Sequence, residues 1–258
     1  MGNSGIGKFS STELSKQLSG KSACASVGAY SYEHAVNAGG SPKDIETILQ
    51  LMYLNFTAPR FDETDLQNLK NMYVPYFRNM EADPGYLMGK AFQETLYQNH
   101  VRRQATSAAQ IESLNLETLA SVHKQLFSYA DDFRFVIAGN VDLETLKPLV
   151  EKYIGSLPTS KKVEYAVVDD GVRFAEGVVT NDFRTAMQQP KVSVRLVYTG
   201  DYENNARNRM AMELLSRALD SRYLVSIREE KGGTYGVSVN GGINDEPVEN
   251  YVLTIAFD

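Results

Sequence analysis

The residues best suited to chemistry lie close together near the C-terminal end of the chain. There Arg228 is followed by Gly232 and Gly233, and then by Thr234 and Tyr235. A guanidinium offers a fixed fork of donors for a carboxylate or a carbonyl, and a phenol offers one hydroxyl donor. Together these groups could hold the backbone or the C-terminal carboxylate of a peptide, or stabilise the oxyanion of a tetrahedral intermediate.

The two glycines allow the chain to reverse sharply, which predicts a helix-to-strand corner carrying both Arg228 and Tyr235. A structural role is the alternative for each side chain. An arginine near the C-terminus of a helix is favoured by the helix dipole, and tyrosine is common where a strand begins. The residue types alone leave both readings open.

Metal chemistry is not indicated in this chain. His34, His100 and His123 are its only histidines, and none lies in an H-E-x-x-H or H-x-x-E-H pattern. A zinc site needs three or four clustered ligands, and these residues are scattered. We therefore predict no metal ligands, and we interpret His123 as a structural or surface residue.

Other catalytic patterns fail as well. No serine lies in G-x-S-x-G, and Cys24 has the small neighbours of a buried strand thiol. Gly20-Lys21-Ser22 is no phosphate loop, because position 15 is serine where that motif needs its first glycine.

The elements that must position the corner are a long helix and a hairpin. The apolar spacing predicts a helix over about 205–230 that ends at the two glycines. Strands are predicted at 234–240 and 251–257, where they form a hairpin, and a half-buried strand at 192–198.

The preceding part of the chain alternates helical patterns with loops, followed by one strand. Helices are predicted to begin near 41, 62, 83, 107, 115 and 142, and a buried strand is predicted at 132–139. This interleaving predicts the α+β class, with two layered domains over 1–165 and 166–258 and an inter-domain linker at 159–175. Both ends interrupt a pattern, so we expect a fragment with two truncated domains.

Composition restricts the partners and leaves the compartment open. The chain has 258 residues, a net charge of −6 and no basic stripe, which argues against nucleic acid and anionic membranes as partners. No apolar run approaches the ~18 residues of a membrane span. One cysteine allows no intramolecular disulfide, and a cytosolic, a periplasmic or another oxidising location is compatible with that.

The stretch from Arg228 to Gly236 resembles the Arg/Tyr signature of the pitrilysin/insulinase-type zinc peptidases, or inverzincins. In that family, the signature lies in the half of the enzyme opposite the zinc. Further stretches follow the family's order after its metal-helix region, so that the resemblance covers nearly the whole chain; they lie at 9–14, 29–34, 56–62 and 135–142.

The resemblance implies a metallopeptidase-like fold of the LuxS/MPP type, with a degenerate third domain over 1–165 and the start of a fourth over 166–258. Where an active domain carries its downstream metal-ligand glutamate, this chain reads MYVPYF at 72–77, without an acid. The implied cofactor is therefore zinc in the N-terminal half of the parent enzyme, with none in this chain. By itself the chain is expected not to cut peptides.

The resemblance also implies the partners and the site. The partners are a catalytic zinc-bearing half, fused or separate, and peptide substrates. Arg228 and Tyr235 would carry the catalytic contribution, with substrate bound by Arg228, Gly232, Gly233, Thr234 and Tyr235. Unpaired edges of truncated sheets would also invite homodimers as an artefact.

Two alternatives stand beside the peptidase interpretation. The first is a zinc-free structural or assembly subunit of the same architecture, such as a respiratory-complex core protein or a processing-peptidase-like subunit. In those subunits the Arg/Tyr pair tends to be lost, whereas here it is intact, which favours the peptidase. The second is a free-standing peptide-binding module, which would require both ends to be genuine.

Overall fold

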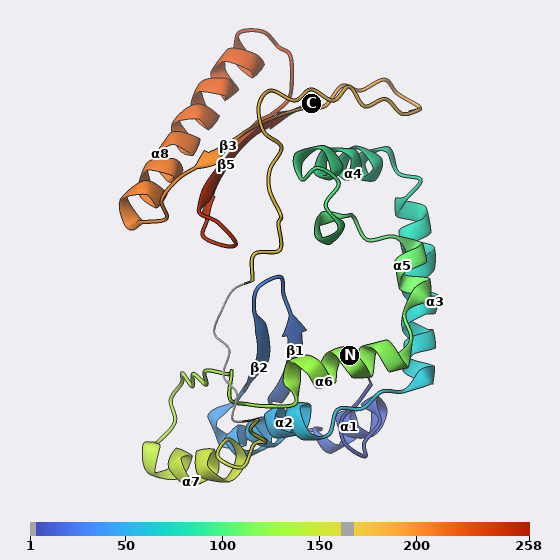
Figure 1. Ribbon diagram of the computed structural model, residues 1–258, viewed down its shortest axis with the longest axis vertical. Coiled ribbons are helices and arrows are strands. Elements are labelled where there is room, and N and C mark those ends of the chain that lie inside the picture. Colours follow the sequence, from blue (N-terminus) through green and yellow to red (C-terminus); the bar gives the residue numbers. More distant parts are fainter. Residues whose placement is uncertain (1–3, 161–167) are drawn as a thin grey trace. The chain divides into compact units, whose positions relative to one another are not determined.

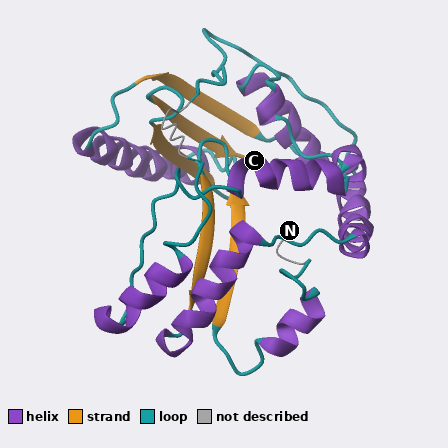
Figure 2. Cartoon of the chain, turned by 60° about the horizontal axis from the view of Figure 1, so that its bottom comes forward, coloured by secondary structure: helices purple, strands orange, loops and turns teal. Residues whose placement is uncertain are grey.

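The computed structural model describes residues 4–160 and 168–258 of the chain. Helices and short antiparallel sheets are interleaved along it, which confirms the predicted α+β class (Figures 1 and 2). Two compact units form, one from Met1–Asn79 with Thr106–Ala166 and the other from Met80–Ala105 with Val167–Asp258. The assignment of 1–165 and 166–258 to a third and a fourth domain stays a prediction.

The first unit combines one β-ribbon with several helices. The ribbon pairs strands β1 and β2 antiparallel, with Ala23 opposite Gly40. The bounds of these elements are β1 (Ala23–Ala29), β2 (His34–Gly40), α1 (Ser11–Gln17), η1 (Pro42–Asp44), α2 (Ile45–Thr57), α3 (Glu63–Met80), α5 (Ala108–Ser113), α6 (Leu116–Phe127) and α7 (Leu143–Tyr153).

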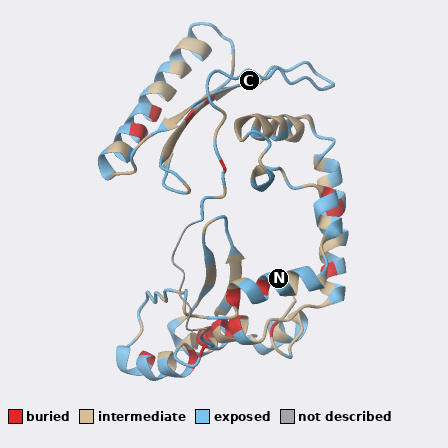
Figure 3. Cartoon of the chain, viewed as in Figure 1, coloured by how far each residue is buried: buried red, intermediate tan, exposed pale blue. Residues whose placement is uncertain are grey.

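The core of this unit is centred on α2, which packs against both strands of the ribbon and against α7. Its buried side chains are Leu49, Met52, Phe56, Leu146, Tyr153 and Leu157. Figure 3 shows this buried cluster in α2 and its neighbours. Apolar residues at helical spacing thus bury one face of α2, as their periodicity predicts.

The buried strand predicted at 132–139 does not form. The segment is irregular, and Val136 and Ile137 are exposed. Phe133 and Phe135 nevertheless pack against Phe56. The centroid of the Phe56 ring lies 5.0 Å from that of Phe133 and 6.2 Å from that of Phe135. The aromatic residues are therefore anchored as the pattern suggests. The strand is missing because, in the part of the chain that the structure describes, no neighbouring strand pairs with it.

The second unit contains a three-stranded antiparallel sheet in the order β3-β5-β4. Figure 1 labels two of its strands, β3 and β5. Leu196 lies opposite Ile255 on one side of the central strand, and Val239 lies opposite Ile255 on the other. The elements of the sheet and its helix are β3 (Val194–Asp201), β4 (Val237–Asn244), β5 (Asn250–Phe257) and α8 (Ala206–Tyr223). The predicted strand, helix and hairpin all form, although the bounds of the helix and of the first strand of the hairpin differ from those predicted.

Helix α8 covers β4 and β5 on one face of this sheet and forms a compact core with them. Its buried members are Met212, Val239, Leu253 and Ile255, of which Ile255 is only 1% exposed. The rest of the second unit includes α4 (Pro84–Leu96) and the short turn η2 (Val101–Arg103). The position of α8 on the sheet therefore fixes where its C-terminal end meets the start of β4.

Part of the predicted linker is packed rather than free. Residues 161–167 of the predicted 159–175 segment lie outside the described residues. Further along, Val172 is buried, Asp170 forms an ion pair with Arg102 at 3.0 Å, and the Ala175 amide donates to the Leu96 carbonyl at 2.8 Å. This stretch is therefore tied to α4 and η2.

Candidate functional site

The predicted corner forms where α8 ends. The helix continues into a π-helix, η3 (Leu224–Glu229), whose last turn carries Arg228. The Gly232 amide donates to the Arg228 carbonyl at 3.1 Å, and the Gly233 amide donates to the Ile227 carbonyl at 3.0 Å. Gly232 has φ +59°, a left-handed conformation that glycine adopts without strain. The paired glycines thus stop the helix, as predicted.

The strand after the corner begins later than expected. The sequence predicts it from Thr234, but β4 begins at Val237. The Thr234 hydroxyl donates to the Gly236 carbonyl at 3.0 Å and accepts from the Gly236 amide at 3.2 Å. These local hydrogen bonds compete with a strand ladder, so Tyr235 lies in a turn before the strand.

The five predicted site residues therefore share one short exposed segment. Tyr235 is 98% exposed, Arg228, Gly232 and Gly233 are also exposed residues, and Thr234 is half-buried. Within residues 4–160 and 168–258, no hydrogen bond or ion pair engages the Arg228 guanidinium or the Tyr235 hydroxyl. Their donors are therefore available to an external acceptor, although the two side chains are not joined to each other.

The base of the corner is closed by a residue that the sequence analysis did not single out. Asp220, one turn before the end of α8, accepts a hydrogen bond through Oδ1 from the Val239 amide at 3.1 Å. Asp220 follows Met212 and Ser216 at helical spacing on the face of α8 that meets the sheet. The sequence does contain a signal for this role, because Asp220 places a carboxylate on a helix face that otherwise carries apolar and small residues.

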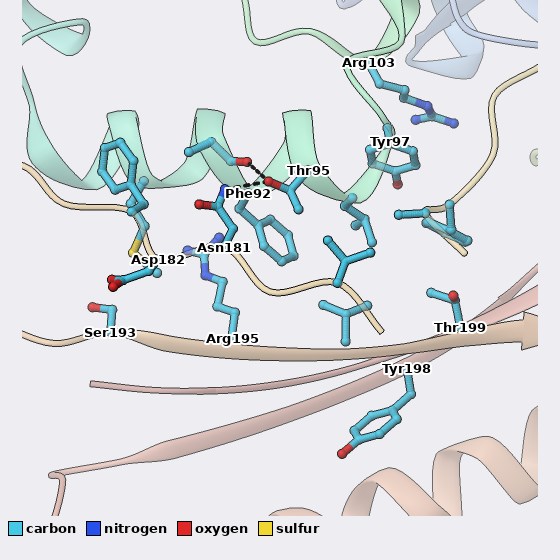
Figure 4. A pocket seen from close by; sticks show the side chains of 18 of the residues that line it. Phe92, Thr95, Tyr97, Arg103, Asn181, Asp182, Ser193, Arg195, Tyr198 and Thr199 are labelled. Carbon is cyan, nitrogen blue, oxygen red and sulfur yellow. Dashed lines mark hydrogen bonds between the residues drawn. The ribbon is translucent and has the colours of Figure 1, made fainter. Parts of the chain in front are cut away.

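A separate hollow of about 1520 Å³ lies in the second unit between α4, β3 and the segment 172–191 (Figure 4). The Arg195 guanidinium lies over the Phe92 ring at 5.0 Å, and the Asn181 amide donates to the Thr95 hydroxyl at 2.6 Å. None of the predicted site residues lines this hollow. The corner is therefore an exposed segment that lies outside this hollow.

The histidines have structural surroundings. His123 is buried between the rings of Phe61 and Phe127, at centroid distances of 5.8 and 5.2 Å. His34 lies near Phe127, and His100 contacts the Asp170 carbonyl at 3.2 Å. Among the described residues, no three His, Cys, Asp or Glu side chains are grouped so that they could hold a metal ion. Zinc therefore does not fit this part of the chain.

Two further properties bear on the expectations from sequence. Cys24 lies in β1 but is exposed, so the prediction of a buried thiol is wrong. It alternates along β1 with the half-buried Ala23 and Ala25, and this places its side chain on the open face of a two-stranded ribbon. No helix in the described residues is long and apolar enough to cross a bilayer.

The similarity to known proteins is extensive. Residues 113–255 match the family described as "Peptidase M16 inactive domain". The chain is 24% identical over 235 residues to a protein of Escherichia coli (strain K12) named "Probable zinc protease PqqL", covering 91% of the chain and 25% of that protein. It spans about a quarter of the length of the curated relatives that it matches.

Solved structures share the fold. The crystal structure of the periplasmic protease PqqL from Escherichia coli superposes with a TM-score of 0.81 at 23% identity, over 99% of this chain and 28% of that one. A peptidase M16 inactive domain from Pseudomonas fluorescens superposes with a TM-score of 0.65 at 21% identity, over 100% of this chain and 62% of that one. The chain belongs to the M16 inactive-domain family, the non-catalytic C-terminal half of pitrilysin/insulinase-type zinc peptidases.

Proposed function

We propose that this chain is the substrate-binding part of a zinc metalloendopeptidase whose metal is held by another half of the enzyme. The single observation that carries the proposal is the corner, where Arg228 and Tyr235 present exposed side chains without partners among the described residues. Membership of an inactive-domain family whose relatives include named zinc proteases supports a role next to a metal site held elsewhere in the enzyme.

The corner suits the recognition of a peptide backbone. The Arg228 guanidinium can donate two parallel hydrogen bonds to a carboxylate, or separate ones to carbonyl oxygens. The Tyr235 hydroxyl adds a single donor at the same end of β4. Donors held on a fixed turn orient the scissile carbonyl and stabilise the negative charge that develops on its oxygen. Gly232, Gly233 and Thr234 hold the turn through their backbone and hydroxyl bonds.

The proposed partner is the zinc-bearing half, as a fused or a separate chain, and for a bacterial parent the proposed compartment is the periplasm. The similarity to an Escherichia coli protein described as a periplasmic protease supports this location. Fractionation of cells expressing the full-length protein tests it. Recovery in the periplasmic fraction is the expected result, and recovery only in the cytosol would contradict it.

The role of the corner is tested by Tyr235→Phe in the full-length enzyme. Removing one donor to a developing oxyanion should lower kcat by about 10²- to 10³-fold, with the zinc content unchanged. Tyr198→Phe is the control, because it removes the hydroxyl of another exposed tyrosine, on β3 and away from the corner. Unaltered turnover of Tyr235→Phe would refute the proposed role.

A further inference from the structure

We infer that Asp220 is the positioning residue that holds Arg228 and Tyr235 in place, an inference that rests on the proposed function of the corner. Asp220 and Val239 bracket the segment 221–238, which contains both proposed substrate-binding side chains. The hydrogen bond from the Val239 amide to Asp220 Oδ1, at 3.1 Å, joins the two stems of this segment. It therefore sets where the helix end lies relative to the start of the strand.

The bonded amide lies on the free edge of the sheet. Strand β4 pairs only with β5 in the described sheet, and Val239 lies opposite Ile255. In an antiparallel pair, the backbone N–H and C=O groups of alternate residues bond to the partner strand. The N–H and C=O groups of the residues between them point away from that partner. Because Asp220 reaches the Val239 amide from α8, that amide points outward. Asp220 thus satisfies an edge donor that would otherwise be open to solvent or to another strand.

Among the described residues, the other hydrogen bonds of the corner do not reach β4. The Gly232 and Gly233 amides bond to Arg228 and Ile227 at the end of η3, and the Thr234 hydroxyl bonds to Gly236 within the turn. Within the described chain, the bond of Asp220 is the one side-chain hydrogen bond between α8 and β4.

Apolar packing holds the two stems on both sides of Asp220. Ser216 lies one helical turn before it, against Gly241, where α8 approaches β4 closely. Towards the corner, Tyr223 and Val237 pack against the core formed by α8 and the sheet. Asp220 adds a directional hydrogen bond to this packing, so its loss should leave the helix on the sheet and loosen the position of the corner.

The test uses the full-length enzyme carrying Asp220→Ala, with Asp220→Asn and Glu213→Gln as comparisons. Asp220→Ala should lower kcat/KM about tenfold, since a small misplacement of orienting groups is costly. Asp220→Asn keeps an oxygen acceptor and should restore most of the activity. Glu213→Gln removes a carboxylate from the same helix, whose hydrogen-bond partner among the described residues is Arg217, and should have no effect.

A mutant-cycle comparison separates positioning from general stability. If Asp220 acts through the corner, Asp220→Ala should lower the activity little further in a background that carries both Arg228→Ala and Tyr235→Phe, whereas an independent structural defect would add in full. Amide exchange should also accelerate at Val239 and over 228–236, with α8 unchanged before Asp220.

Two results would overturn the inference while leaving the proposed function intact: full activity of Asp220→Ala, or an undiminished loss in the background that carries both Arg228→Ala and Tyr235→Phe. Full turnover of Tyr235→Phe alone would refute the proposed function, and the positioning role of Asp220 with it.

Discussion

The close approach of α8 to β4 at Gly241 makes a sharp prediction about stability. A methyl group added at Gly241 would lie 2.4 Å from Ser216 Oγ and 2.7 Å from Met212 Sδ. Ordinary contacts between heavy atoms lie near 3.5–4.0 Å, so the helix must withdraw by roughly 1 Å or the side chains must rotate. Rotating Ser216 would break its buried hydrogen bond to the Met212 carbonyl, which is 2.8 Å long.

Overpacking of this kind costs about 1–3 kcal/mol of unfolding free energy. Gly242→Ala is the matched control, because it adds the same methyl group one residue along β4, where no atom lies within 4 Å. The control should be neutral or stabilise by up to about 1 kcal/mol through the unfolded chain. The contrast between two neighbouring glycines therefore isolates the contact with α8 from the general effect of replacing glycine.

The assay is urea unfolding of the two variants. Unfolding is monitored by amide hydrogen exchange in peptides from the second unit. A readout specific to that unit is needed because two compact units need not unfold in one step. The free energy of unfolding falls by about 1–3 kcal/mol per molar urea. The midpoint urea concentration of Gly241→Ala should therefore be lower by on the order of 1 M. Adding Ser216→Ala should restore part of the loss. Equal midpoints for Gly241→Ala and Gly242→Ala would refute the reasoning.

Two further predictions concern titration in the first unit. Burial lowers the pKa of His123, so its folded value lies below the unfolded value of about 6.5. The unfolded state then binds more protons, and stability should fall as the pH drops through 6.5 towards the folded value. His123→Phe should flatten this dependence, and parallel pH–stability profiles would contradict it. Hydrogen bonds from Lys152 and Tyr153 lower the pKa of Glu46. Tyr153→Phe should raise that pKa towards its ordinary value in an NMR titration, and an unchanged value would exclude the contribution of the hydroxyl.

Much of the fold could be predicted because local signals determine it. Asn115 and Asp142 cap α6 and α7 through side-chain bonds to Thr118 and Thr145, and such caps are visible in sequence. The end of the long helix at Gly232 follows from the left-handed conformation that only glycine adopts readily. These features depend on neighbouring residues and need no knowledge of the rest of the chain.

The errors arise where distant segments decide the outcome. The residues at 132–139 have a strand composition, but a strand also needs a partner, and sequence patterns do not show whether one is present. The π-helix η3 and the late start of β4 depend on the bonds of Gly233 and Thr234 within the turn. Residue types could predict that Arg228 lies at a corner, but not the anchoring of that corner by Asp220.

We propose that this chain supplies the substrate-binding side of a zinc peptidase whose metal is held by another half of the enzyme. The most direct measurement is peptide hydrolysis by the chain alone and after mixing with the candidate zinc-bearing half, with the metal content of each determined by mass spectrometry. We predict hydrolysis only in the mixture, with zinc confined to the partner. Zinc-dependent hydrolysis by this chain alone would contradict the account.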